Sequence, residues 1–161
     1  VRSRRQRQMC IRDRTYPLLR GVNFITEQFY GPEDGTFISF ITKKIKEGSM
    51  VDLTPGTQKR DFLFIEDLLS AFFVVFRAKE THVKGMMDIE LGSGKEKSIK
   101  EVGLLCCDIL GGDPKLLGWG NVAFRSNEVM SSVANIQALR SLGWKPRFSL
   151  KEGLSSFLNR K

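Results

Sequence analysis

Gly56-Thr57-Gln58-Lys59-Arg60-Asp61-Phe62-Leu63-Phe64-Ile65-Glu66-Asp67 combines a turn, a buried run and a helix start in one short stretch. The Pro55-Gly56 pair before it predicts the turn. The apolar run that ends at Ile65 predicts a short strand entering the core. Glu66 and Asp67 then open a helical pattern, where acidic side chains suit the positive end of the helix.

Arg60 lies at the mouth of this turn. A guanidinium can hold a phosphate through two parallel hydrogen bonds, because its planar fork matches the anion. The alternative is structural, since most neighbouring Arg and Asp residues form local pairs. The stretch by itself leaves both roles for Arg60 open.

Strands alternate with helices on both sides of this stretch, which predicts an α/β fold. Predicted strands and extended pieces cover Val22–Thr26, Met50–Leu53, Asp61–Phe64, Met86–Leu91, Leu116–Leu117 and Val122–Phe124. Predicted helices cover Thr36–Glu47, Glu66–Ala78, Ser98–Leu110, Asn135–Leu142 and Ser149–Asn159, and Glu27–Gly35 is predicted as a loop. Two helices begin with a capping box, in which a serine and the glutamate three residues later satisfy each other's amides.

Several short motifs follow one another in a specific order around the central stretch. They are Tyr30-Gly31-Pro32, Leu91-Gly92-Ser93-Gly94, Arg125-Ser126-Asn127-Glu128 and Leu142-Gly143-Trp144-Lys145-Pro146. Their order and spacing resemble the C-terminal half of the extended short-chain dehydrogenase/reductase family, the NAD-dependent sugar-nucleotide epimerases and dehydratases. The resemblance covers residues 22–158, nearly all of the chain.

The resemblance implies the C-terminal portion of an extended Rossmann-type fold: the last strands of the parallel sheet and a small α/β substrate-binding domain. It places residues 15–161 in that portion, and residues 1–14 are expected to be a non-native or disordered basic tail. The sequence has no glycine-rich dinucleotide fingerprint. The family's catalytic Tyr-x-x-x-Lys pair is expected upstream, and Tyr16 is not assigned to it, so no catalytic residue is predicted.

The site residues that the resemblance implies are substrate-binding ones. Arg60 and Arg125 match the family's two diphosphate ligands, and Gln28 stands where the family often has an asparagine that contacts substrate. The remaining matches are Thr36 and Phe37 in the segment that closes over the sugar nucleotide, Leu53 and Thr54 along the base, and Glu27 near the nicotinamide. Phe37 has an equally good alternative role in core packing. No metal site is predicted.

Charge and cysteine content limit the remaining functional classes. The chain of 161 residues has a net charge of +8. Residues 1–14, with six arginines and one aspartate, carry most of that charge, so the rest has no nucleic-acid footprint. The longest apolar run is too short to span a bilayer, and no signal peptide is visible. The cysteines Cys10, Cys106 and Cys107 fit neither a disulfide framework nor a zinc site and suit a reducing cytoplasm.

The sequence therefore predicts part of an NAD(P)-dependent enzyme that rearranges a nucleotide-linked sugar, such as a deoxysugar for surface polysaccharide. Its expected partners are NAD or NADP and a nucleotide-diphosphate sugar, with no nucleic acid and no membrane, and the intact enzyme is expected to be a homodimer. Two alternatives stay open: a non-catalytic sugar-nucleotide-binding fragment, and a 4-keto reductase as the parent enzyme.

Overall fold

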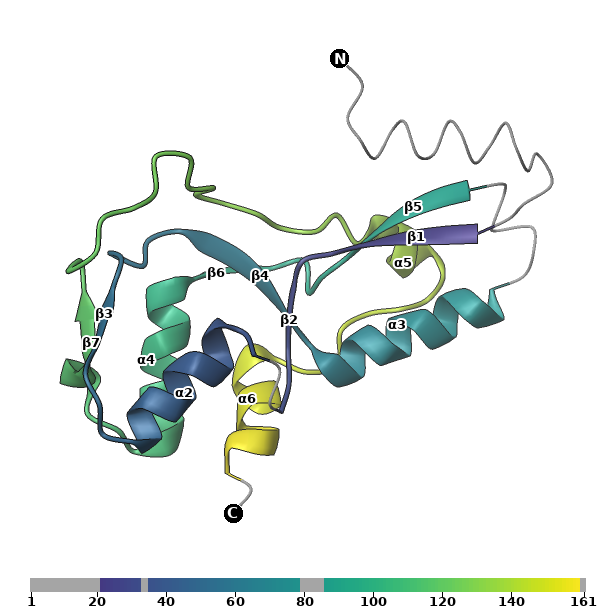
Figure 1. Cartoon of the computed structure of the whole chain (residues 1–161). Coiled ribbons are helices and arrows are strands. Elements are labelled where there is room, and N and C mark those ends of the chain that lie inside the picture. Colours follow the sequence, from purple (N-terminus) through teal and green to yellow (C-terminus); the bar gives the residue numbers. More distant parts are fainter. Residues whose placement is uncertain (1–20, 33–34, 79–85, 160–161) are drawn as a thin grey trace.

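The computed structural model describes residues 21–32, 35–78 and 86–159 (Figure 1). The predicted basic tail, residues 1–14, and Tyr16, which is not assigned as the catalytic tyrosine, lie outside the described residues. The strands are β1 (Gly21–Thr26), β2 (Gln28–Tyr30), β3 (Val51–Leu53), β4 (Lys59–Phe64), β5 (Met86–Leu91), β6 (Glu96–Ser98) and β7 (Leu117–Trp119). The helices are α2 (Phe37–Lys46), α3 (Ile65–Arg77), α4 (Ile99–Leu110), η2 (Pro114–Leu116), α5 (Gln137–Ser141) and α6 (Leu150–Leu158).

Two hydrophobic cores lie on either side of β4, which runs through the middle of the molecule (Figure 1). One core forms between β5, α3 and α5, and the other packs α2, α4 and α6 against β4. Strand pairs β1–β5, β2–β4 and β3–β7 are parallel, and only β6 runs antiparallel to its neighbour β4 among the described strands. Helices packed on parallel strands confirm the predicted α/β class.

The central stretch folds as the turn, strand and helix that its sequence predicts. Gly56 has φ +70°, and a Cβ there would lie 2.7 Å from the Trp119 ring, so only glycine fits this turn. Strand β4 then carries Phe62 and Phe64 into the core, where each is nearly fully buried. Both predicted capping boxes form, at Ser98 and at Ser149.

The loop prediction for residues 27–35 was wrong at its start. Gln28, Phe29 and Tyr30 form strand β2, which pairs in parallel with Phe62–Phe64. Tyr30 is 1% exposed, and its ring centroid lies 5.5 Å from that of Phe64. Three residues are too few to display a strand's alternation, so tertiary packing decides this element.

Predictions in the C-terminal half were also wrong in detail. Residues 122–124 form no strand, and the strand of this region is β7. Asn135 is not the N-cap of α5, because Ile136 takes that position. The Asn135 side chain instead accepts a hydrogen bond from the backbone N–H of Gln137 at 3.2 Å. Asparagine favours such local turns as strongly as it favours caps, so the sequence signal was ambiguous.

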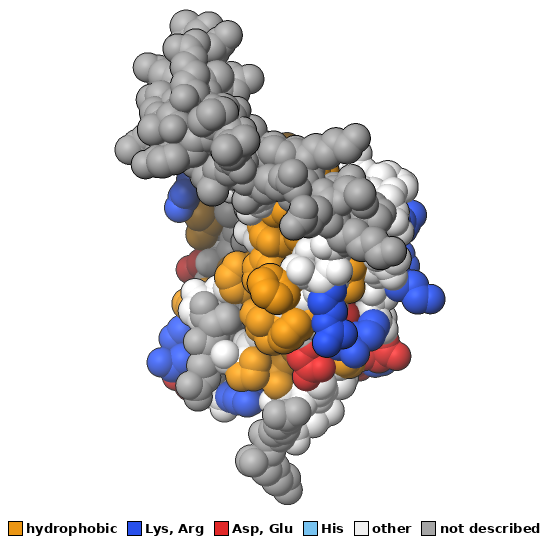
Figure 2. Space-filling model, turned by 90° about the vertical axis from the view of Figure 1, so that its right-hand side faces the viewer, with side chains coloured by type: hydrophobic (Ala, Val, Ile, Leu, Met, Phe, Trp, Pro, Cys, Tyr) orange, Lys and Arg blue, Asp and Glu red, His pale blue; other side chains and the backbone are white. Residues whose placement is uncertain are grey.

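Helix α3 is buried on one face only. Its inner face packs through Leu68, Ala71 and Val75. On its outer face Phe73 is 66% exposed and Phe76 is 89% exposed. Figure 2 shows hydrophobic side chains gathered at the centre of this side of the molecule. An exposed apolar patch of this kind is unusual for a monomer and favours association.

Replacing Phe73 and Phe76 by serine is expected to reduce binding of a hydrophobic dye and self-association. The midpoint of thermal unfolding should change little, because exposed side chains contribute little to stability. Ala71→Ser on the buried face is the control: it should lower the midpoint and leave dye binding in place. Equal dye fluorescence for the wild type and the double serine variant would show that Phe73 and Phe76 do not form the surface to which the dye binds.

Glu101 makes stability depend on pH through the capping box of α4. Its carboxylate accepts hydrogen bonds from the backbone N–H of Ser98 and from Lys97 Nζ, and these bonds lower the pKa of Glu101 to about 2. A carboxyl with a lowered pKa stabilises the fold above its unfolded pKa, about 4.3, and this contribution is lost as the pH falls towards 2.

Glu101→Gln is therefore expected to lower the thermal midpoint at neutral pH and to match the wild type near pH 2. Glu66→Gln, which removes an exposed acid from the first turn of α3, is the control for charge removal. Melting curves recorded as a function of pH measure the difference. A Glu101→Gln deficit that persists unchanged at low pH would show that the carboxylate charge is not its cause.

Candidate functional site

A long connection, residues 120–134 and here called the return segment, runs along the molecule between β7 and α5 (Figure 1). The backbone N–H groups of Gly120 and Val122 donate to the Leu53 carbonyl at 3.0 and 3.1 Å. Further along, Lys59 N–H donates to the Met130 carbonyl at 2.8 Å. The return segment is thus fixed to the end of β3 and the start of β4, where several predicted site residues lie.

Arg60 is joined to the return segment by an ion pair. Its Nη2 lies 2.8 Å from Glu128 Oε1, and its Nη1 donates to the Lys59 carbonyl at 2.7 Å. The Glu128 N–H donates to the Arg125 carbonyl at 3.1 Å, which closes a turn between these two residues. The two arginines come from distant parts of the sequence, and the fold brings Arg60 against the turn that begins at Arg125.

The two arginines differ in how they are held. The Arg60 side chain is only 17% exposed, and Glu128 opposite it is 22% exposed. Arg125 lies on the surface of the return segment. A partly buried guanidinium fixed by a carboxylate and a carbonyl keeps further N–H groups for an anion. Arg60 therefore has an acid partner that is distant in sequence, and it keeps N–H groups beyond those that these contacts use.

Glu27 also contacts the return segment. It follows β1 directly, and its N–H donates to the Leu91 carbonyl at 2.9 Å. Its carboxylate accepts a hydrogen bond from the Ser132 hydroxyl at 2.9 Å. Gln28, the next residue, is exposed at the start of β2. Both residues therefore lie where β1 ends, and parallel strands in such folds commonly place their ligands at these carboxyl ends.

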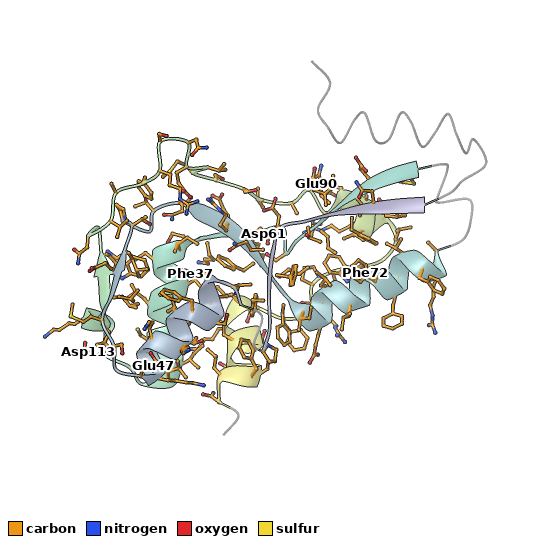
Figure 3. All side chains as sticks on the ribbon, in the orientation of Figure 1. Phe37, Glu47, Asp61, Phe72, Glu90 and Asp113 are labelled. Atoms are coloured by element: carbon orange, nitrogen blue, oxygen red, sulfur yellow. The ribbon has the colours of Figure 1, made fainter. Side chains whose placement is uncertain are left out.

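The remaining predicted residues fall into two groups. Leu53 and Thr54 lie at the end of β3, where Leu53 bonds the return segment and Thr54 Oγ1 accepts a hydrogen bond from Gln58 at 3.2 Å. Thr36 and Phe37 lie at the beginning of α2, and Phe37 packs against the core formed with α4 and α6 (Figure 3). The structure therefore gives Phe37 a packing role, and it places Leu53 beside the segment that carries Arg125.

Asp61 connects the neighbourhood of Arg60 to the end of β5 and to the return segment (Figure 3). It is 0% exposed, and its carboxylate accepts hydrogen bonds from the Ser93 N–H and hydroxyl, the Gly94 N–H and the Ala134 N–H. A buried carboxylate with this many donors is stabilised by them without a cation. Asp61 thereby fixes the end of the return segment relative to β4.

The Gly92-Ser93-Gly94 turn does not fit a dinucleotide pyrophosphate. The amides of Ser93 and Gly94, which could face a phosphate, already donate to Asp61 at 2.7 and 2.9 Å. A Cβ at Gly92 would lie 2.4 Å from the Asp61 carboxylate, so this glycine makes room for Asp61. The Gly92-Ser93-Gly94 turn therefore supplies no pyrophosphate cradle for a dinucleotide.

Neither a metal site nor a membrane span is found in the part of the chain that the structure describes. Within residues 21–32, 35–78 and 86–159, no group of three or more His, Cys, Asp or Glu side chains could hold a metal ion. None of the helices in the same ranges is long and apolar enough to cross a membrane.

Sequence reasoning missed two residues that organise this site. The sequence predicts Glu128 only as part of the motif that begins at Arg125, and it predicts no role for Ser132. The signal for Glu128 is its spacing of three residues from Arg125, which allows a turn to present it to another element. No sequence signal points to Ser132, because its partner Glu27 is 105 residues away.

Residues 6–92 match the model of the NAD dependent epimerase/dehydratase family. The chain is 36% identical over 142 residues to CDP-abequose synthase of Salmonella muenchen, which covers 87% of this chain and 47% of that protein. Among solved structures, UDP-glucose 4-epimerase of Thermotoga maritima with UDP-glucose superposes with a TM-score of 0.81 at 21% identity, over 94% of this chain and 48% of that one. The dTDP-glucose 4,6-dehydratase of Bacillus anthracis in complex with NAD superposes with a TM-score of 0.78 at 22% identity, over 94% of this chain and 47% of that one.

These two structures show that the chain shares their fold. At 21% and 22% identity they support no conclusion about its function. The chain spans about half the length of the curated relatives and solved structures that it matches.

Proposed function

The chain belongs to the NAD-dependent epimerase/dehydratase family, and we propose that it supplies the substrate-binding part of an enzyme acting on a nucleotide-diphosphate sugar. The observation that carries this proposal is the contact between Arg60 and the Arg125–Glu128 turn. It brings the Arg60 guanidinium against the turn that begins at Arg125, so that two arginines from separate elements are available to one ligand. A diphosphate needs such paired cations when it enters a partly dry site.

In this proposal each residue has a distinct task. Glu128 and the Lys59 carbonyl hold the Arg60 side chain in one orientation, so that its free N–H groups meet the diphosphate. Arg125, on the exposed part of the return segment, supplies the second fork. Leu53 and Thr54 line the base, and Gln28 and Thr36 contact the remainder of the substrate. Holding the diphosphate orients the sugar, which is the main contribution that binding residues make to a reaction.

The family is NAD-dependent, and hydride transfer is the chemistry that a nicotinamide cofactor supplies when bound. The Gly92-Ser93-Gly94 turn does not fit its pyrophosphate, because its amides already donate to Asp61. We propose that the residues that bind the cofactor correspond to the part of the relatives that this chain does not match, with Glu27 near the nicotinamide.

A deoxysugar nucleotide is the favoured substrate within this class, because CDP-abequose synthases from two Salmonella strains are 36% and 34% identical to the chain. This supports a surface-polysaccharide precursor and keeps a keto-sugar reductase as the alternative to an epimerase or dehydratase. The non-catalytic alternative, a sugar-nucleotide-binding fragment, shares the same binding site.

Calorimetric titration of the 161-residue chain with nucleoside diphosphates tests the proposal. Cytidine, uridine, guanosine and thymidine diphosphates should each bind, with one base preferred. Free sugar and unphosphorylated nucleoside are the controls and should not bind measurably. A chain that is folded by circular dichroism and binds none of the four diphosphates would remove the proposed substrate class.

A further inference from the structure

A second pocket, here called the basic pocket, lies apart from the residues assigned to the sugar nucleotide. Its volume is about 560 Å³. It forms where the segment between β5 and β6 meets the connection from α5 to α6. Its lining residues are Phe62, Ser93, Lys95, Lys97, Arg140, Lys145, Pro146, Arg147, Phe148, Ser149, Leu150 and Glu152. None of the residues predicted to bind substrate or cofactor is among them.

The lining of the basic pocket is strongly positive. It contains five cationic side chains and a single carboxylate, Glu152. That carboxylate accepts the Ser149 N–H at 2.8 Å in the capping box of α6, so it is already engaged. Among the described residues, Lys95, Arg140 and Lys145 have no ion-pair partner. Like charges that converge on one concavity raise the local potential for an anion.

Two further cations are held in fixed positions. The Arg147 Nε lies 3.6 Å from Asp67 Oδ1, and the Arg147 guanidinium carbon lies 5.5 Å from the centroid of the Phe148 ring. The backbone N–H groups of Arg147 and Phe148 donate to the same Asp67 carboxylate, which is almost fully buried. Lys97 pairs with Glu101 at 3.0 Å. The fold therefore fixes one wall of the pocket before any ligand arrives, which lowers the ordering cost of binding.

The shape and the apolar wall set the size of the ligand. Phe62 and Phe148 line the pocket together with charged groups that come from three separate segments. The start of α6, which faces the pocket through Ser149 and Leu150, adds the positive end of a helix. Two linked phosphates offer oxygens to more of these cations than one phosphate does, which favours a diphosphate as the ligand.

We propose that the basic pocket binds a phosphate anion of diphosphate size, at a site separate from the Arg60–Arg125 region. The lysines and Arg140 neutralise the anion, and Arg147 orients it through its fork. The shared ligand chemistry has two sources: a free pyrophosphate, and the diphosphate of a nucleotide whose base lies against Phe148.

The test uses the Arg60→Ala/Arg125→Ala chain, because this background lacks the proposed substrate site. Pyrophosphate titrated into it should bind at one site per chain. Adding Arg140→Gln and Lys145→Gln should weaken that binding by about tenfold or more, since two charge-assisted contacts are lost. Lys115→Gln, which removes one exposed charge outside the pocket, is the matched control and should change the affinity less than about twofold.

Two arms identify the source of the anion. If the ligand is a nucleotide, cytidine diphosphate should bind more tightly than pyrophosphate, and Phe148→Leu should abolish that advantage. If it is free pyrophosphate, the two anions should bind equally and Phe148→Leu should have no effect. The charge-preserving variant Arg140→Lys/Lys145→Arg should bind pyrophosphate in either case, which separates charge from folding. The proposal is overturned if pyrophosphate does not bind to the Arg60→Ala/Arg125→Ala chain. It is also overturned if Lys115→Gln weakens pyrophosphate binding as much as Arg140→Gln and Lys145→Gln do.

Discussion

The Asp61→Ala variant is expected to lose about 3–5 kcal/mol of the free energy of unfolding, a large part of a domain's stability. Asp61 is 0% exposed and accepts hydrogen bonds from Ser93, Gly94 and Ala134. Alanine would leave these donors buried without an acceptor, and each such donor costs about 1–3 kcal/mol when solvent does not replace the bond. The structure relaxes partly and water enters the site, so the expected loss of unfolding free energy is smaller than the sum of the costs of the individual donors.

Chemical denaturation of the wild type and of two variants measures this loss. Asp88→Ala is the matched control, because Asp88 is exposed and, within the described residues, its carboxylate accepts one hydrogen bond, from Asn23 Nδ2 at 2.8 Å. It should cost less than about 1 kcal/mol. Hydrogen exchange should accelerate at the Ser93, Gly94 and Ala134 amides in Asp61→Ala. An unfolding free energy equal to that of Asp88→Ala would show that the buried carboxylate does not join these segments.

The Arg60→Ala and Arg125→Ala variants are each expected to weaken binding of a nucleoside diphosphate by about 30-fold or more. Removing one fork leaves phosphate oxygens desolvated without a partner, which costs about 2–5 kcal/mol. This loss corresponds to a factor of 30 to several thousand in the dissociation constant. Calorimetric titration measures both constants, and the thermal midpoints of the variants verify that the fold is intact.

Lysine at either position should rescue binding only in part, because a point charge cannot reproduce the two parallel hydrogen bonds of a guanidinium. Arg60→Lys should bind more weakly than Arg125→Lys, since Arg60 must also keep its bond to Glu128. Glu128→Gln tests that orientation separately: it should weaken binding less than Arg60→Ala does. Full rescue by lysine at both positions would mean that charge alone, without fork geometry, holds the ligand.

Local signals predicted much of the fold because they act within a few residues. The Pro55-Gly56 turn, the two capping boxes and the strands β4 and β5 each depend on neighbours in sequence, and each forms as predicted. The short strands β2 and β6 were missed because three residues carry no periodicity of their own. Their existence depends on pairing with β4, which a single sequence does not reveal.

The candidate site shows the same difference between what the sequence predicts and what long-range contacts decide. Arg60 and Arg125 were paired through a resemblance, and the residues alone could not have joined them. Glu128 and Ser132 contact Arg60 and Glu27 across 68 and 105 residues of sequence. Contacts at such separations are set by the path of the return segment, which has no regular pattern to read.

The most direct test of the central claim compares a nucleoside monophosphate with the corresponding diphosphate. If two arginines hold the diphosphate, the wild-type chain should bind cytidine diphosphate far more tightly than cytidine monophosphate. In the Arg60→Ala/Arg125→Ala chain that also carries Arg140→Gln and Lys145→Gln, so that the basic pocket does not contribute, the two dissociation constants should become nearly equal, because the second phosphate no longer has forks to meet. The same preference for the diphosphate in the wild type and in this fourfold variant would contradict the account.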